Sequence, residues 1–273
     1  MNIGIIGQGF VGNAVYQKFK SFFKVYTYDI KKELSNSTYE KLVQNCRIIF
    51  LCVPTPMNKN GSCNIDFVKG ILTKLNKESK FIIVNKSTVP PGTTEKLNKD
   101  FKNLEIIYNP EFLTERNAIS DFNNQDRIIL GGPRPATTEV KQIYSKVFPN
   151  LYVIKTGSKH AEMVKYFTNC FLACKVSFAN EMHDLSVSLN LDYDKVIEYA
   201  SLDKRLGTSH WAVPGPDGDF GFGGHCFPKD LAAIIKMTDD LKTINDTLKS
   251  IQKTNDKVRT NRDWEKMKGR AII

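Results

Sequence analysis

The sequence predicts an α/β protein in two parts: a mostly parallel sheet covered by helices, then a region built of helices alone. Over the first 155 residues, short apolar strand segments alternate with helical segments, as parallel strands joined by crossover helices require. After that point, apolar residues recur at helical spacing and no strand segment follows. We therefore expect a sheet domain over residues 1–155 and a helical domain over residues 156–273.

Seven strand segments are expected in the first part. The third, RIIFLCV, is apolar throughout, which is typical of a strand that is buried on both faces of a parallel sheet. The strands are predicted at residues 2–6, 24–28, 47–53, 81–85, 105–108, 127–130 and 151–154. Helices are predicted at residues 10–20, 66–76, 92–101 and 137–148.

The second part is expected to contain one long helix and three shorter ones. Residues 161–189 keep apolar residues at helical spacing without proline or glycine, so they are predicted to form a single helix. Residues 207–224 are rich in glycine and proline, which indicates a loop. The shorter helices are predicted at residues 194–200, 229–237 and 240–260.

The composition is typical of a globular protein, with 41% hydrophobic and 25% charged residues in a chain of 273. No apolar stretch approaches the ~20 residues that cross a bilayer. The chain enters a strand at its second residue, so neither a membrane segment nor a signal peptide is expected. The six cysteines follow neither a metal-ligand spacing nor a disulfide framework. We therefore expect no metal, and a location in the reducing cytoplasm.

The formal net charge of +10 comes from 39 basic and 29 acidic residues. Such a charge is compatible with a phosphate-bearing ligand or with nucleic acid. The lysines are scattered, however, without the basic and aromatic pattern of proteins that bind single-stranded nucleic acid. We interpret the charge as a solvated surface and expect no nucleic-acid partner.

A dinucleotide-binding motif follows the first predicted strand. Residues 7–12 (GQGFVG) match GxGxxG between a strand and a helix, where glycines admit a pyrophosphate to the helix N-terminus. Asp29 closes the next strand and can accept hydrogen bonds from the adenosine ribose. Its charge would repel a 2′-phosphate, so a Rossmann-type domain that prefers NAD to NADP is predicted. The expected cofactor contacts in this region are Gly7, Gly9, Phe10, Val11, Gly12 and Asp29.

Hydroxyl side chains follow the third and fourth strands. The carboxyl ends of strands line the cofactor crevice in a sheet of this type. Thr55 follows the third strand, and Ser87 and Thr88 follow the fourth. We expect these residues to contact the cofactor or the substrate. The alternative is that they are ordinary helix caps.

Cys226 lies in the most informative segment of the chain, FGFGGHCFPKD over residues 220–230. Its three glycines permit backbone angles and close approaches that a side chain forbids, and Pro228 suits the first turn of a helix. Cys226 is therefore expected at a helix N-terminus, where the dipole favours the thiolate, with Lys229 and Asp230 nearby. This setting predicts a nucleophile. The alternative is a buried structural cysteine.

Two further pairs of polar residues have i,i+4 spacing. Glu111 and Glu115 follow the fifth strand and are expected to face one side of a turn or helix, where one binds substrate and the other takes a proton from water. Lys165 and Asn169 lie among apolar residues of the long helix, which suggests a directed pair of donors. The alternatives are two solvated glutamates and a lysine whose charged end reaches solvent.

Together these segments resemble the UDP-glucose/GDP-mannose 6-dehydrogenase family. The resemblance covers nearly the whole chain and is carried by NPEFLTERNAISDF with DRIILGG, by AEMVKYFTN and by FGFGGHCFPKD. Members of this family oxidise the primary alcohol of a nucleotide sugar to a carboxylate, using two NAD and one water. The resemblance implies an enzyme that converts UDP-glucose to UDP-glucuronate. GDP-mannose and a UDP-N-acetylhexosamine remain open as substrates.

The resemblance implies a catalytic role for several side chains. Cys226 resembles the nucleophile that captures the aldehyde as a thiohemiacetal, which is then oxidised to a thioester. Lys165 and Asp230 resemble groups that position water and stabilise the developing alkoxide. Asn169 resembles a second donor to that oxygen. Glu115 resembles the base for thioester hydrolysis.

The resemblance also implies contacts with water, substrate and a second subunit. Glu111 and Thr88 resemble the residues that support Glu115, with Thr88 ordering the water. Substrate contacts are expected from Glu111, Phe112, Leu113, Arg205 and Lys229. Lys86 and Lys204 are further candidates for contacts with the sugar phosphates. Arg205 resembles an arginine that reaches across a dimer interface, and the long helix resembles the family's dimerisation helix, so a homodimer is expected.

The sequence departs from the family at its end. The family usually continues into a second Rossmann-like domain that grips the uridine nucleotide, whereas this sequence ends at Ile273. We expect that domain to be absent. Two alternatives therefore stay open: an NAD-binding subunit without catalysis, and a two-electron dehydrogenase of the hydroxyacid type, whose chemistry needs no cysteine.

Overall fold

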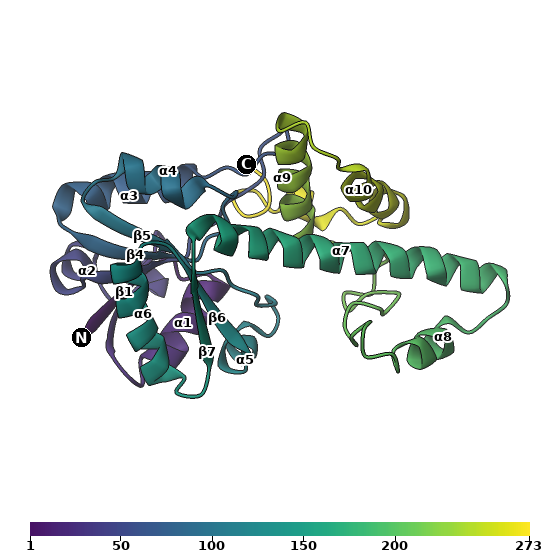
Figure 1. Cartoon of the computed structure of the whole chain (residues 1–273), viewed down its shortest axis with the longest axis horizontal. Coiled ribbons are helices and arrows are strands. Elements are labelled where there is room, and N and C mark those ends of the chain that lie inside the picture. The colour runs from purple at the N-terminus through teal and green to yellow at the C-terminus, as the bar shows by residue number, and fades with distance from the viewer. The chain divides into compact units, whose positions relative to one another are not determined.

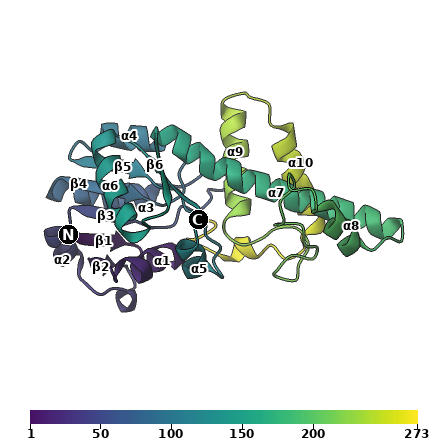
Figure 2. The same ribbon diagram turned by 60° about the horizontal axis from the view of Figure 1, so that its bottom comes forward.

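The computed structural model describes all residues from Met1 to Ile273, and its elements are labelled in Figure 1 and seen from another side in Figure 2. The chain forms two compact units. The first consists of Met1–Thr55 and Ile65–Lys165, and the second of Pro56–Asn64 and Tyr166–Ile273. Helix α7 (Ser158–Ser188) begins in the first unit and continues into the second, so the division falls inside this helix rather than at residue 155.

The first unit is built on a seven-stranded sheet with the strand order β2-β1-β3-β4-β5-β6-β7. Its strands are β1 (Asn2–Ile6), β2 (Lys24–Tyr28), β3 (Ile48–Leu51), β4 (Phe81–Asn85), β5 (Leu104–Tyr108), β6 (Arg127–Gly131) and β7 (Tyr152–Thr156). Neighbouring strands are parallel except β5 and β6, which pair antiparallel at Tyr108 and Gly131. The mostly parallel sheet expected from the sequence is therefore confirmed.

Helices cover both faces of this sheet, as Figure 1 shows. They are α1 (Phe10–Phe19), α2 (Tyr39–Asn45), α3 (Asp66–Glu78), α4 (Thr93–Asp100), α5 (Ala118–Asn123) and α6 (Arg134–Val147). Ile48 and Phe50 of β3 pack in a core with α1 and α6, whereas Ile49 and Leu51 pack in a second core with α2, α3 and α4. Because both faces are buried, β3 is apolar at every position.

The second unit consists of helices and loops around α7. Its other helices are α8 (Tyr193–Ala200), α9 (Phe227–Asp240) and α10 (Asp246–Val258). Tyr166 of α7 packs in one hydrophobic cluster with Leu231 of α9 and Ile251 of α10. Further along α7, Ala179 packs in a separate cluster with Tyr193 of α8, which lies beside the far end of α7 in Figures 1 and 2. None of the helices combines the length and apolarity needed to span a bilayer.

The structure differs from the sequence-based expectation in the short helices. Periodicity misses α2 and α5, which have seven and six residues, because about two turns contain too few apolar repeats. The helix expected from residue 240 starts only at Asp246. The preceding helix α9 continues to Asp240, and Lys242 then turns the chain with a φ of 54°.

Candidate active site

The three glycines of the motif, of which two precede α1 and the third lies in its first turn, have different environments. A Cβ atom on Gly7 would lie 2.3 Å from the carbonyl oxygen of Cys52, and one on Gly12 would lie 1.9 Å from the carbonyl oxygen of Gly7. Gly7 also has a φ of +91°, which favours glycine. Gly9, the N-cap residue of α1, has no atom within 4 Å of that position. Gly7 and Gly12 are thus required by packing within the chain, whereas Gly9 leaves the helix N-terminus open.

The start of α1 suits a negatively charged group. Its first turn begins with Phe10 and Val11 and contains no acidic residue, and no side chain caps it. After β2, a carboxylate oxygen of Asp29 accepts a hydrogen bond from the N–H of Gln8 at 2.6 Å, which fixes Asp29 beside the glycine motif. An uncapped helix N-terminus, an open Gly9 and a fixed carboxylate fit the phosphates and ribose of a dinucleotide.

The hydroxyl residues at the ends of β3 and β4 are buried. Ser87 joins the two strand ends, because its Oγ accepts a hydrogen bond from the N–H of Val53 at 3.0 Å. Thr55 and Thr88 are also buried. The alternative that Ser87 and Thr88 cap the next helix is excluded, since the N-cap residue of α4 is Gly92. Their contacts with a cofactor or substrate stay a prediction.

Lys86 is a buried cation rather than a surface lysine. Its Nζ donates a hydrogen bond to Oδ1 of Asn109 at 3.0 Å, and the hydroxyl of Tyr144 donates to the same oxygen. Burial lowers the pKa of Lys86 to about 8, against the opposing effects of Cys52 and Glu111. Burial likewise raises the pKa of the Cys52 thiol to about 12. The structure thus places Lys86 in a network that the sequence did not reveal.

Glu111 and Lys165 form a buried ion pair in the first unit. The Nζ of Lys165 donates to Oε1 of Glu111 at 2.8 Å and to its backbone oxygen at 2.7 Å. The other carboxylate oxygen accepts from the N–H of Leu113 at 2.8 Å. Burial alone would raise the pKa of Glu111, but Lys165, the N–H of Leu113 and Lys86 hold it below its ordinary value. The charged end of Lys165 therefore faces a carboxylate inside the unit rather than solvent.

The expectation that Glu111 and Glu115 face one side of a turn or helix is wrong. Glu111 is buried, whereas Glu115 is exposed. Residues 109–114 form no helix, and α5 begins only at Ala118. Because i,i+4 spacing aligns two side chains only within a helix, the spacing says nothing about this extended segment.

A cavity of about 250 Å³ lies beside this ion pair. Its lining includes Lys86, Glu111, Phe112, Leu113, Phe122 and Arg127. The guanidinium of Arg127 lies over the ring of Phe112, 4.9 Å from its centroid. Three residues expected to contact substrate, Glu111, Phe112 and Leu113, therefore line one cavity within the first unit.

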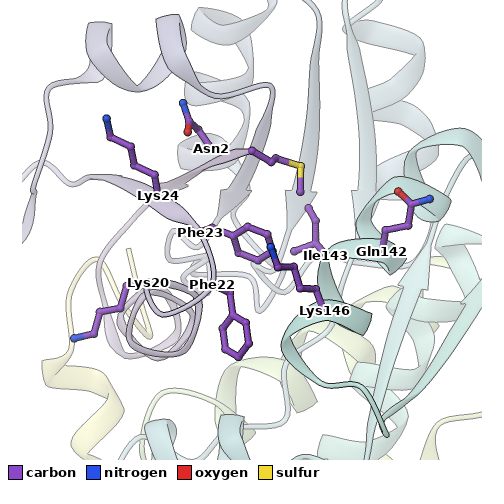
Figure 3. Close-up of a pocket in the computed structure, with 9 residues that line it drawn as sticks. Asn2, Lys20, Phe22, Phe23, Lys24, Gln142, Ile143 and Lys146 are labelled. Atoms are coloured by element: carbon purple, nitrogen blue, oxygen red, sulfur yellow. The ribbon is translucent and has the colours of Figure 1, made fainter.

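A larger cavity, of about 580 Å³, lies at the amino-terminal edge of the sheet. Figure 3 shows Phe22 and Phe23 after α1, Asn2 at the start of β1, and Lys146 of α6 around it. None of the residues predicted for the site lines this cavity. Size alone therefore does not locate the site, and the buried polar residues are the better guide.

Glu162 is a buried carboxylate that the sequence did not single out. It is fully buried, and its two oxygens accept hydrogen bonds from the N–H groups of Gly92 at 2.6 Å and Thr94 at 2.7 Å. These groups begin α4, where a negative charge is favourable. Glu162 precedes Lys165 by about one turn of α7, so it holds this end of the helix beside α4. Its partners lie 70 and 68 residues earlier, and no local pattern indicates them.

In the second unit, Cys226 is the N-cap residue of α9 and Pro228 lies in the first turn, as expected. Asp230 is almost fully buried one turn further on. Its carboxylate accepts a hydrogen bond from Nδ2 of Asn169 at 2.6 Å and pairs with Nζ of Lys229 at 2.5 Å. The structure thus brings a residue of α7 to the first turn of α9, beside the cysteine.

Lys229 is a buried cation close to two thiols. Burial would lower its pKa, but the carboxylate of Asp230 and the sulfurs of Cys226 and Cys63 hold it above its ordinary value. Lys229 therefore carries its charge at neutral pH. Cys226 is only partly buried and forms no disulfide. A partly exposed thiol beside an ammonium group fits a nucleophile better than a structural cysteine.

Arg205 lies on the surface, with 89% of its side chain exposed. Its Nε donates to both carboxylate oxygens of Asp203 at 3.0 Å. This hydrogen bonding lowers the pKa of Asp203. The expected contact of Arg205 with substrate stays a prediction.

These features define a dinucleotide-binding α/β protein whose second unit presents a cysteine at a helix start. A comparison with known families identifies the group to which it belongs. The model of the UDP-glucose/GDP-mannose dehydrogenase family, NAD binding domain, matches residues 21–148, and that of the same family's central domain matches residues 159–257. The chain belongs to the UDP-glucose/GDP-mannose dehydrogenase family and contains its NAD-binding domain.

Individual relatives agree with this assignment. The UDP-glucose 6-dehydrogenase of Pseudomonas aeruginosa is 33% identical over 225 residues, which cover 77% of this chain and 49% of that protein. The solved UDP-glucose dehydrogenase of Pyrobaculum islandicum superposes with a TM-score of 0.85 at 28% identity, over 94% of this chain and 68% of that one. The UDP-D-ManNAc dehydrogenase of Pyrococcus horikoshii has a TM-score of 0.80 at 20% identity, over 94% and 69%, and shows the shared fold alone. The chain spans about half the length of the curated relatives it matches.

The buried state of Lys86 predicts a pH-dependent stability. Between about pH 8 and 10.5, the unfolded chain still binds a proton on Lys86 that the folded chain has released. The free energy of unfolding should therefore rise over this range, by at most about 3 kcal/mol from this residue. Urea unfolding at a series of pH values measures the rise, which Lys86→Met should remove. Lys80→Met, at an exposed lysine, is the matched control. Equal pH slopes in the wild type and in Lys86→Met would contradict the buried cation.

Proposed function

We propose that this chain acts as an NAD-dependent oxidoreductase that converts UDP-glucose to UDP-glucuronate. Family membership and the names of the relatives from P. aeruginosa and P. islandicum support this function. The observation that carries it is Cys226 at the start of α9, with buried Lys229, Asp230 and Asn169 around the first turn. Neither an NAD-binding subunit without catalysis nor a hydroxyacid dehydrogenase needs such a set. GDP-mannose and a UDP-N-acetylhexosamine are the alternative substrates.

The glycine motif and Asp29 would hold the dinucleotide, with further contacts from the strand ends at Thr55, Ser87 and Thr88. The open N-terminus of α1 would receive the pyrophosphate, and the carboxylate of Asp29 would accept from the adenosine ribose. When bound, NAD supplies a hydride acceptor. The protein supplies orientation, charge and the nucleophile.

Cys226 is proposed to carry the reacting carbon covalently. Its thiolate bonds to the carbonyl carbon of the aldehyde formed in the first oxidation as the π bond of the carbonyl breaks, and the oxygen takes up the proton that the thiol has lost, which gives the hydroxyl of a thiohemiacetal. The second oxidation removes a hydride and that hydroxyl proton, which leaves a thioester. Water then attacks the thioester carbon, the carbon–sulfur bond breaks, and a carboxylate and the thiol are released. Two NAD are reduced and one water is consumed for each sugar.

Lys165, Asn169 and Lys229 are proposed to stabilise the negative charges in this sequence. Lys229 stays protonated beside Cys226 and so favours the thiolate. Asn169 is oriented by its hydrogen bond to Asp230, and its amide is proposed as a donor to the substrate oxygen. Lys165 is proposed as the second donor, held in place by Glu111.

Two glutamates are candidates for the hydrolysis step. Glu111 is fixed by Lys165 and, because its pKa is lowered, is ionised at neutral pH. We propose that Glu111 accepts a hydrogen bond from the hydrolytic water, with Thr88 ordering that water. The role of Glu115 as the base stays a prediction from the family resemblance, and its exposed position gives it no comparable support.

A homodimer through α7 is proposed as the assembled form. Phe167, Phe171 and Phe178 lie on one face of this helix and are 66%, 57% and 53% exposed. A row of exposed aromatic rings is typical of a protein interface. Arg205 is proposed to contact the substrate of the neighbouring subunit. A location in the cytoplasm is proposed because none of the six cysteines forms a disulfide.

The NADH yield per sugar tests the proposed function. We expect two NADH per UDP-glucose consumed, and little NADH with GDP-mannose or UDP-N-acetylglucosamine. Cys226→Ala should lower the rate of carboxylate formation by at least about a thousandfold, because the covalent step is lost. Cys174→Ala, at a cysteine outside the proposed site, is the matched control. A Cys226→Ala protein that still forms two NADH per sugar would overturn the assignment of the nucleophile.

The position of Asp29 predicts selectivity between cofactors. We expect NAD to bind at least about tenfold more tightly than NADP, since a 2′-phosphate would meet the fixed carboxylate. Asp29→Asn keeps an acceptor for the N–H of Gln8 but removes the charge, so it should narrow this difference. Fluorescence titration with both cofactors measures it. Equal affinities in the wild type would contradict the proposed role of Asp29.

A further inference from the structure

Polar side chains enclose the backbone of the glycine-rich loop, residues 220–224, that precedes Cys226. The N–H of Phe222 donates to Oδ1 of Asn255 at 2.7 Å, and Nδ2 of Asn255 donates back to the carbonyl oxygen of Phe222 at 3.0 Å. The N–H of Gly224 donates to both carboxylate oxygens of Asp263 at 3.1 Å. The loop is therefore held by hydrogen bonds to residues that follow it by 33 and 39 positions.

Arg259 is the charge at the centre of this arrangement. Only 1% of its side chain is exposed. Its Nη1 lies 2.8 Å from Oδ2 of Asp217, and its Nη2 lies 3.6 Å from Oδ2 of Asp219 and 3.3 Å from Oδ1 of Asp263. Its Nε donates to the carbonyl oxygen of Asn261 at 2.8 Å. A buried guanidinium with partners on every side has few alternative positions.

The glycines of the loop are explained by this enclosure. A Cβ atom on Gly223 would lie 2.2 Å from Nη2 of Arg259 and 2.4 Å from Oδ1 of Asp263. A Cβ atom on Gly221 would lie 2.3 Å from Oδ1 of Asn255, and Gly221 also has a φ of +66°. The close approach that the glycines permit at these two positions is thus to the protein's own polar side chains.

The enclosed loop leads directly to the cysteine. Gly224 is bound through its N–H to Asp263, and only His225 separates it from Cys226. On the other side, Cys226 is the N-cap residue of α9, whose Leu231 lies in the hydrophobic cluster of the unit. The direction of the Cys226 side chain is therefore set by a polar anchor before it and a packed helix after it.

We propose that Arg259 is a positioning residue: through Asp263 it fixes the loop at residues 220–224 and so holds the Cys226 thiol at the start of α9, beside the charge of Lys229. This inference rests on the proposed role of Cys226 as the nucleophile. If Arg259 is replaced, Asp263 loses its cation and the loop gains freedom. Cys226 then spends less time at the helix N-terminus, where its thiolate is favoured.

Alkylation of Cys226 tests this role without turnover. The full-length protein is treated with iodoacetamide over a range of pH, and mass spectrometry follows the peptide that contains Cys226. In Arg259→Gln we expect the pH midpoint of alkylation to rise by about one unit, which is about a tenfold lower rate at neutral pH. If Arg259 contributed only to packing, its replacement would expose the thiol and speed its alkylation but leave the pH midpoint unchanged. An unchanged midpoint in a folded Arg259→Gln protein would overturn the proposal.

Two further variants complete the experiment. Arg262→Gln is the matched control, since Arg262 is three residues away, is 43% exposed and pairs with Asp256 and Glu265 at the surface; its alkylation profile should match the wild type. Asp263→Ala removes the acceptor of the Gly224 N–H while Arg259 keeps its other partners, and should raise the midpoint in the same direction. If Arg259→Gln does not fold, the result for Asp263→Ala decides.

The alkylation experiment and the NADH-yield experiment test the two proposals separately. If Cys226→Ala still forms two NADH per sugar, the nucleophile assignment fails, whereas the effect of Arg259 on the alkylation profile is measured independently. If Arg259→Gln and Asp263→Ala leave the pH midpoint of alkylation unchanged but Cys226→Ala is inactive, the assignment of the nucleophile stands and the positioning role is rejected.

Discussion

A buried ion pair between Lys165 and Glu111 fixes the segment that follows β5 to the first turns of α7. Both side chains are almost fully buried, so each charge depends on the other, and removal of one partner from such a pair costs about 3–5 kcal/mol. Glu162, about one turn earlier in α7, reinforces this contact, because its carboxylate accepts hydrogen bonds from the N–H groups at the start of α4. The cavity lined by Glu111, Phe112 and its neighbours depends on this attachment, because the extended segment has no helix or strand of its own.

Buried charges with partners from distant parts of the chain also occur in the second unit. Asp230 is buried but is satisfied by Asn169 and Lys229, and Arg259 is buried among carboxylates. Each buried charge has a partner from a distant part of the chain, which makes the local backbone rigid. Cys226 lies in the sequence between Gly224, whose N–H is bound by Asp263, and the buried Asp230. Rigid, paired charges of this kind suit catalysis, since they stabilise a transition state without reorganising.

The strands and the cysteine-bearing helix start were predictable, because their signals are local. The segment Phe81–Asn85 is a short apolar run bounded by polar residues, and its predicted bounds agree with the structure. Ala118–Asn123 was missed because six residues show no clear period. The expectation that Glu111 and Glu115 face the same side was wrong, because i,i+4 spacing aligns two side chains only within a helix. The role of Arg259 was not predictable, since its partners are set by the tertiary fold and an isolated arginine has no motif.

The identity of the atom that carries the substrate tests the central claim most directly. The protein is quenched with acid during turnover of UDP-glucose and NAD, digested, and its cysteine peptides are examined by mass spectrometry. We expect the acyl group of the oxidised nucleotide sugar on the peptide that contains Cys226, at higher occupancy in Glu111→Gln, where hydrolysis is slowed. An acyl group on another of the six cysteines, or NADH formation with no adduct on Cys226 in either protein, would contradict a covalent role for this thiol.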